Sequence, residues 1–188
     1  AQAIDRNALI QPFNIGGWVA TTRLVAPGMP GDAGGVSERW EGTNLEQRRI
    51  IAAGRVAQWE QASGRELELR IALPSGPGSD LLFRGLAADM LRIGVTAKRV
   101  GADDPADLRL RDRVARYGEA RWFLNQFNCS FANGPCSREA DELVARSINQ
   151  ADPAAEAAML AEAERILTAA NIYIPLGAPI RWSQVRGG

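Results

Sequence analysis

Alternating apolar and polar positions in the middle of the chain predict a β-strand. Leucine or isoleucine occupies every second position from 67 to 73, which is the period of a half-buried strand, and Pro74 ends the run. Residues 95–100 and the alternating run 107–111 predict two further strands. Apolar residues at helical spacing separate the first two strands, namely Leu82, Leu86, Met90 and Ile93. This strand–helix–strand order predicts two parallel strands joined by a right-handed crossover.

Helical signals come before and after this unit. Residues 1–13 predict a short helix, and a longer one is expected over 43–62. Thr43 and Glu46 match a capping box, in which each side chain accepts a hydrogen bond from a free backbone N–H, and Gly64 is the expected stop.

Two more helices are predicted near the end of the chain. Ser137 is the expected cap of the first, and Asp152 followed by Pro153 opens the second. Their predicted buried positions are Ala140, Leu143, Val144 and Ile148, then Met159, Leu160, Ala163, Ile166, Leu167 and Ala170. Residues 172–176 are predicted to be extended, with one more strand over 181–186.

These elements predict an α/β fold of mixed α+β type, with a small mixed sheet flanked by helices. With 188 residues, 46% of them apolar, the chain is long enough to bury a core. Residues 24–42 are rich in glycine and proline, and we expect a surface loop or a boundary between parts of the fold there.

Composition narrows the function classes. Twenty-two basic residues balance 22 acidic ones, so no net charge attracts the chain to nucleic acid. The sequence contains no histidine, the usual general base and a common zinc ligand. We therefore expect no metal site, no cofactor and no catalytic residues.

Cys129 and Cys136 are the two cysteines. Six residues separate them, too many for a CxxC redox motif, and Asn133-Gly134-Pro135 is turn chemistry that could bring the two sulfurs together. A disulfide is the favoured interpretation, with two free thiols as the alternative. A disulfide would place the protein outside the cytoplasm.

No apolar stretch is long enough to span a membrane. The chain opens on AQAIDRNALI without an initiator methionine and stops at VRGG. We therefore expect a fragment of a longer protein, with any signal peptide upstream.

The order of the segments resembles one family. AIDRNALI followed by LVAPGMPG resembles the entry into the second large lobe of family 5 (peptide/nickel-type) solute-binding proteins of ABC transporters. LELRIALPSGPGSDLLFRGLAADMLRIGVTAKRV is similar to their strand–helix–strand unit. YGEARWFLNQFNC and the final helices, ending in IPLG, are similar to their tail, so the resemblance covers nearly the whole chain.

The resemblance implies a type II periplasmic-binding-protein-like fold in which residues 1–188 form a single lobe. Two such lobes close around a small polar solute and dock on ABC permease subunits. The partners implied are that solute (peptide or amino-acid-like, or an anion), the permease and the missing first lobe of the same protein, and the implied location is periplasmic or extracytoplasmic.

The resemblance also indicates ligand-binding residues. Oligopeptide-binding members hold the peptide ammonium with an aspartate, and Arg116 stands at the matching position here. A guanidinium repels an ammonium, so this position implies a carboxylate or another anion on the ligand. The full set of expected ligand contacts is Arg116, Tyr117, Arg121, Trp122, Asn125 and Asn128.

Simpler roles exist for the same side chains. Arg116 and Arg121 could be solvated or paired with nearby carboxylates, and Tyr117 and Trp122 could belong to the core. Asn128 could have the purely structural role of supporting a turn.

Two other functions compete with solute binding. One is a small hydrolase that uses a carboxylate pair, although the acids are scattered and look like helix caps. The other is a binding-protein-like sensor or interaction domain without permease partners.

Overall fold

The computed structural model describes residues 1–32, 34–131, 136–171 and 173–178. These residues divide into two compact units. Unit 1 contains residues 1–20 and 42–113, and unit 2 contains residues 21–41 and 114–178. None of the described helices combines the length and the apolar character that a membrane span requires.

Unit 1 is built on a small parallel sheet, which confirms the predicted α/β class. In the described part of the chain its strands are β1 (Glu68–Ala72), β2 (Thr96–Val100) and β3 (Leu108–Arg109), in the order β2-β1-β3. β1 pairs in parallel with both neighbours. The predicted pairing of the first two strands is therefore confirmed.

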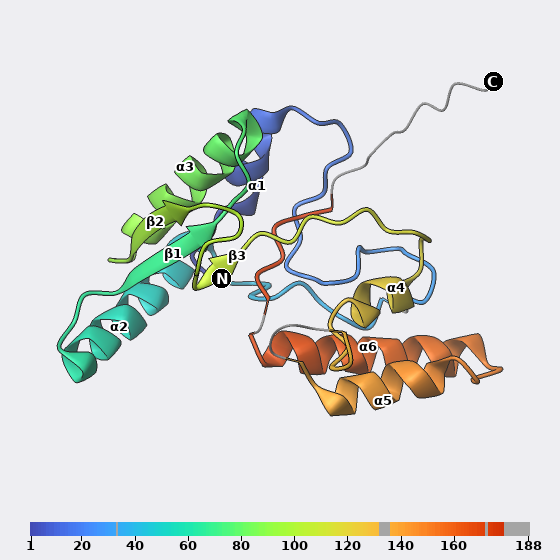
Figure 1. Ribbon diagram of the computed structural model, residues 1–188. Helices are drawn as coiled ribbons and strands as arrows, with labels where there is room; N and C mark the ends of the chain where they lie inside the picture. Colours follow the sequence, from blue (N-terminus) through green and yellow to red (C-terminus); the bar gives the residue numbers. More distant parts are fainter. Residues whose placement is uncertain (33, 132–135, 172, 179–188) are drawn as a thin grey trace, which may run out of the picture. The chain divides into compact units, whose positions relative to one another are not determined.

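Helices cover this sheet. α3 (Pro77–Leu91) connects β1 to β2 and packs on β2, and α1 (Arg6–Ile10) lies against α3 (Figure 1). The 3-10 helix η1 (Gln11–Phe13) continues α1, and α2 (Leu45–Ser63) precedes β1. Buried aliphatic side chains from the strand β1, the helices and the N-terminal segment form the core, including Ile4, Leu9, Ile71, Leu86 and Met90.

The predicted capping box of α2 is one residue out of place. Asn44, and not Thr43, caps the helix: its side chain accepts a hydrogen bond from the Gln47 N–H at 2.9 Å, and the Gln47 side chain accepts one from the Asn44 N–H. Asparagine and glutamine supply the same acceptors as threonine and glutamate, so both registers satisfy the sequence rule. Gly64 ends the helix with a φ of 67°, as predicted.

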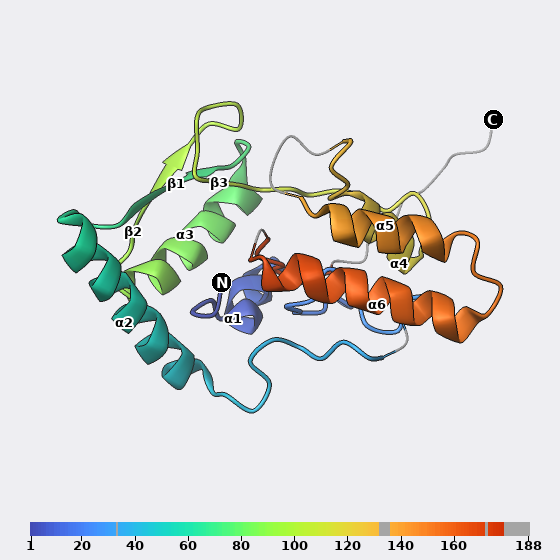
Figure 2. The same ribbon diagram turned by 90° about the horizontal axis from the view of Figure 1, so that it is seen from below.

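Unit 2 is helical. It contains α4 (Ala120–Asn125), α5 (Arg138–Ser147) and α6 (Pro153–Ala169), and α5 and α6 lie side by side (Figures 1 and 2). Both predicted caps are confirmed, because Ser137 accepts from the Ala140 N–H and Asp152 from the Ala154 N–H.

The core of unit 2 joins these helices to the segment 21–41. Its fully buried members are Val25, Ala120, Leu124, Ala140, Val144, Leu160, Ala163 and Leu167. The predicted apolar stripes were wrong at their ends: Ile148, at the C-cap of α5, is 61% exposed, and Ala170, at the C-cap of α6, is exposed. The last turn of a helix projects beyond its packing partner, and the periodicity of the sequence does not reveal where contact stops.

The glycine-rich stretch is a loop, but its first residues are not at the surface. Val25 is 1% exposed and belongs to the core, and Arg23 is buried with it. Residues 173–177 form no strand. The strand predicted over 181–186 lies outside the described residues.

A buried ionic cluster attaches this loop to α6. The Arg23 guanidinium donates to both carboxylate oxygens of Asp32, at 2.8 and 3.1 Å, and to Glu164 at 2.9 Å. Glu164 also accepts hydrogen bonds from the backbone N–H groups of Leu24 and Val25, at 2.9 and 3.2 Å. All three charged side chains are at most 5% exposed.

Each charged group of the cluster has a hydrogen-bonded partner of opposite charge. Burial by itself lowers the pKa of Arg23, but the hydrogen bonds to Asp32 and Glu164 outweigh it and raise that pKa above its usual value. Three charges in a dry interior are stable only when each is paired and hydrogen-bonded, so the loop and the helix depend on each other.

Removing one of these charges should destabilise the protein. We expect Glu164→Gln to lower the free energy of unfolding by about 2–4 kcal/mol, because it leaves Arg23 partly uncompensated in the interior. Glu162→Gln, on the same helix, is the matched control: this residue is 43% exposed and pairs with Arg165, so its loss should cost about 0–0.5 kcal/mol. Urea unfolding of both variants measures the difference, and equal effects would contradict the role given to the cluster.

Candidate functional site

The structure places all six predicted ligand-binding residues in unit 2. Arg116 and Tyr117 lie in a bend just before α4 and are exposed, Tyr117 by 45%. Arg121, Trp122 and Asn125 belong to α4, and Asn128 follows it. This short helix was missed at the sequence level, since six residues carry too little periodicity to be recognised.

These residues differ in how much of their side chains a ligand could contact. Trp122 is 8% exposed and packs edge-on against Phe123, with 5.1 Å between ring centroids. Asn128 supports a turn, because its side-chain oxygen accepts a hydrogen bond from the Ser130 N–H at 2.9 Å. Arg116 and Tyr117 therefore expose the most surface to a ligand, and the ligand-binding role of the six residues stays a prediction.

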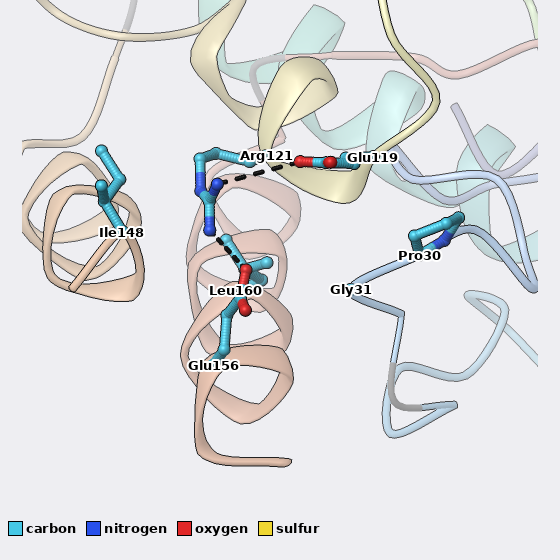
Figure 3. Close-up of a pocket in the computed structure, with 7 residues that line it drawn as sticks. All are labelled: Pro30, Gly31, Glu119, Arg121, Ile148, Glu156 and Leu160. Carbon is cyan, nitrogen blue, oxygen red and sulfur yellow. Dashed lines mark hydrogen bonds and ion pairs between the residues drawn. The ribbon is translucent and has the colours of Figure 1, made fainter. Parts of the chain in front are cut away.

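A recess in unit 2 lies next to these residues. It has a volume of about 380 Å³. Its lining comes from the glycine-rich loop, from α4 and the residue before it, from the residue that follows α5, and from α6 (Figure 3); the residues are Pro30, Gly31, Glu119, Arg121, Ile148, Glu156 and Leu160. Of the six predicted residues, Arg121 is the one that lines it.

Arg121 is the centre of the polar contacts in this recess. Its guanidinium bonds to Glu156, and it donates to the hydroxyl and the backbone carbonyl of Ser147, at 3.2 and 3.4 Å. Glu119 is farther away, with 3.8 Å between its carboxylate and the guanidinium. Figure 3 shows the arginine reaching between the two glutamates. The charge of Arg121 is thus largely compensated within the protein.

The loop wall of the recess is held in place by Asp32. Its carboxylate accepts from the N–H groups of Gly28 and Gly34, at 2.9 and 3.1 Å, in addition to the bonds from Arg23. The Pro30 carbonyl accepts a hydrogen bond from the Ala120 N–H at 2.9 Å, which ties the loop to the start of α4.

Gly31 is required in this wall. Its φ is +82°, and a Cβ there would lie 3.0 Å from Leu160 Cδ1 and 3.2 Å from Ala120 Cβ. A larger residue would be strained and would push the loop away from the core.

Sequence reasoning missed most of the recess. No shared motif connects the segments that contain Glu119, Glu156 and Leu160. The sequence at Pro30 and Gly31 predicts only a turn. The one signal was the density of glycine and proline in the loop, which marks a tightly folded path.

The predicted disulfide is present. The sulfurs of Cys129 and Cys136 are bonded, and the Cα atoms lie 5.2 Å apart. The Cys129 N–H donates to the carboxylate of Asp141 on α5 at 2.9 Å, so the disulfide and this hydrogen bond both connect Cys129 to residues at or near the start of α5. The predicted turn residues between the cysteines lie outside the described residues.

Sites for metal ions are a separate question. In residues 1–32, 34–131, 136–171 and 173–178, no group of three or more cysteine, aspartate or glutamate side chains is arranged to hold a metal ion.

Comparisons with known proteins were made for sequence and for structure. No protein-family model and no curated protein matches the sequence. Solved structures do match. Haemophilus influenzae OppA, in complex with the peptide RPPGFSPFR, has a TM-score of 0.82 at 16% identity over 94% of this chain. The Escherichia coli murein tripeptide binding protein MppA has a TM-score of 0.83 at 15% identity over 95% of it.

The chain has the fold of one lobe of an OppA-like, family 5 peptide-binding protein. Burkholderia pseudomallei OppA agrees, with a TM-score of 0.77 at 21% identity over 94% of the chain. The chain covers 37–38% of the length of these three proteins. The resemblance found in the sequence is therefore confirmed for the fold. The structure divides into two compact units, and it stays a prediction that residues 1–188 together form a single lobe.

Acid should weaken the loop that carries Pro30 and Gly31. Hydrogen bonds from Arg23 lower the pKa of Asp32 from its usual 3.8 to about 2, and N–H groups of Gly28 and Gly34 add to this, against the opposing effect of burial. A carboxyl with a lowered folded-state pKa contributes stability above its unfolded pKa and loses it as the pH falls through the folded value. The contribution is at most about 2.5 kcal/mol at pH 7.

We therefore expect the free energy of unfolding to fall as the pH drops from about 5 toward 2, and Asp32→Asn to flatten this slope. Urea unfolding across this pH range measures it. Asp103→Asn, at an exposed position, is the control and should keep the slope. An unchanged slope in Asp32→Asn would rule out the proposed role of Asp32.

The disulfide can be tested by counting reactive thiols. Protein purified without reductant should show no reactive thiol in denaturant and two after reduction, and reduction should lower the free energy of unfolding by about 2–3 kcal/mol. The double variant Cys129→Ser, Cys136→Ser should show none in either state. Two thiols in unreduced protein would contradict the bond.

Proposed function

We propose that this chain is one lobe of the solute-binding component of an ABC importer. The observation that supports this most is the fold, which 94–95% of the chain shares with OppA and MppA. OppA is in complex with a nine-residue peptide and MppA is a murein tripeptide binding protein, so the ligand proposed here is a peptide or a similar small polar solute.

The role is capture and delivery without chemistry. A second lobe of the same protein closes over the solute, and the closed form docks on the permease outside the cytoplasm. Enclosure by two lobes is efficient, since a site must cover most of the surface of a small solute to bind it well. The solved proteins that share the fold are binding proteins, which agrees with a protein that is not an enzyme.

Arg116 is the proposed anchor within this lobe. It is exposed and next to Tyr117, which is 45% exposed and offers an aromatic face. A guanidinium binds carboxylates with two parallel hydrogen bonds, so the favoured solute carries a carboxylate or another anion. Asn125 and Asn128 are half-buried and are proposed to contribute amide contacts, while Arg121 and Trp122 hold α4 in place.

The test is a thermal-shift panel of peptides, amino-acid conjugates and other small solutes on the protein in which this lobe is joined to its counterpart. A ligand that binds only the folded state raises the melting temperature, with about 2.7 kcal/mol of stabilisation at a hundredfold excess over Kd. Arg116→Ala should abolish the shift by carboxylate-bearing solutes.

Arg138→Ala provides the control, because Arg138 is also exposed and lies at the start of α5. It should leave the shift unchanged. Equal shifts in both variants, or calorimetry in which a free peptide amine is required for binding, would reject the arginine anchor. No shift with any solute would reject the transport role.

A further inference from the structure

The unit 2 recess carries a negative charge that the protein leaves open. Arg121 and Glu156 neutralise each other in direct contact, and Nε and Nη2 of the arginine also donate to Ser147, which leaves Nη1 as the nitrogen nearest Glu119. Glu119 lies 3.8 Å from Arg121, beyond hydrogen-bond distance, and is 51% exposed. Across the described residues, no hydrogen bond to its carboxylate is formed. One carboxylate therefore faces the recess with its acceptors free.

The opposite part of the lining is apolar. Ile148 is 61% exposed and Leu160 is 2% exposed, and both line the recess (Figure 3). Pro30 and Gly31 close one side and are fixed by the hydrogen bond to Ala120. A free carboxylate beside an aliphatic wall suits a ligand with a cationic end and a short alkyl chain.

We propose that this recess binds an organic cation, an ammonium or guanidinium group on a short aliphatic chain, with Glu119 as the counter-ion and Ile148 against the chain. Its volume of about 380 Å³ suits one such group. The cation has two possible sources, a free amine or the side chain of a lysine or arginine in a peptide. The site is complete within unit 2, so this proposal does not depend on the transport role.

The partial ion pair explains why Glu119 is available. Arg121 lies 3.8 Å from the carboxylate, too far for a hydrogen bond. A ligand ammonium at about 2.8 Å from the same oxygen forms the stronger, hydrogen-bonded contact. The attraction between partly exposed charges is modest, so binding should be weak and should fall with added salt.

The test is an NMR titration of the 15N-labelled, 188-residue chain with four probes. Cadaverine represents the free amine, and Nα-acetyl-lysine amide represents the peptide side chain. Glutarate carries the opposite charge on a similar chain, and 1-pentanol carries the chain without charge. Binding by either cation, with saturable shifts at the amides of Gly31, Ala120 and Glu156, supports the site and identifies its source.

Two variants decide whether Glu119 is responsible. Glu119→Gln should weaken cation binding at least tenfold, and because the residue is half exposed and makes one long ion pair, the fold should stay intact, as the spectrum of the free variant will show. Glu142→Gln removes an exposed carboxylate from α5, outside the recess, and should leave binding unchanged. The proposal is overturned if neither cation binds, if glutarate or pentanol shifts the same amides equally, or if Glu119→Gln binds as the wild type does.

Discussion

The pairing of Arg23 with Glu164 and Asp32 is the interaction on which the helical unit depends. It connects positions 141 residues apart in the chain and buries three charges that are stable only together. Glu164 holds the backbone at Leu24 and Val25, which places Val25 in the core. Without this contact little would hold the glycine-rich loop against the helices, because turn residues bury little apolar surface.

The geometry of the recess follows from this cluster. Asp32 gathers the N–H groups of Gly28 and Gly34 around itself, and the loop that results presents Pro30 and Gly31 to the start of α4. The same arrangement orders charges by depth: the deepest are fully paired, Arg121 and Glu156 are half-buried and paired, and Glu119 at the rim is only partly compensated. Compensation decreases toward solvent, where an open charge costs least and can meet a ligand.

Rigidly packed and exposed side chains alternate around α4. Trp122 is buried and stabilises α4, whereas Arg116 and Tyr117 are exposed just before it. The disulfide and the hydrogen bond from Cys129 to Asp141 restrain the segment that follows α4. The short helix is therefore supported at both ends.

The sequence by itself determined the local structure. The period-two run at β1, the stops and caps at Gly64, Ser137 and Asp152, and the parallel β1–β2 pair follow from residues close together in the chain. Only the tertiary structure decided that Glu164 is buried, that Ile148 is exposed and that Glu119 faces a recess. Periodicity reports which side of a helix is apolar, but the partner of a polar group and the end of a contact surface are set by segments far away in the sequence.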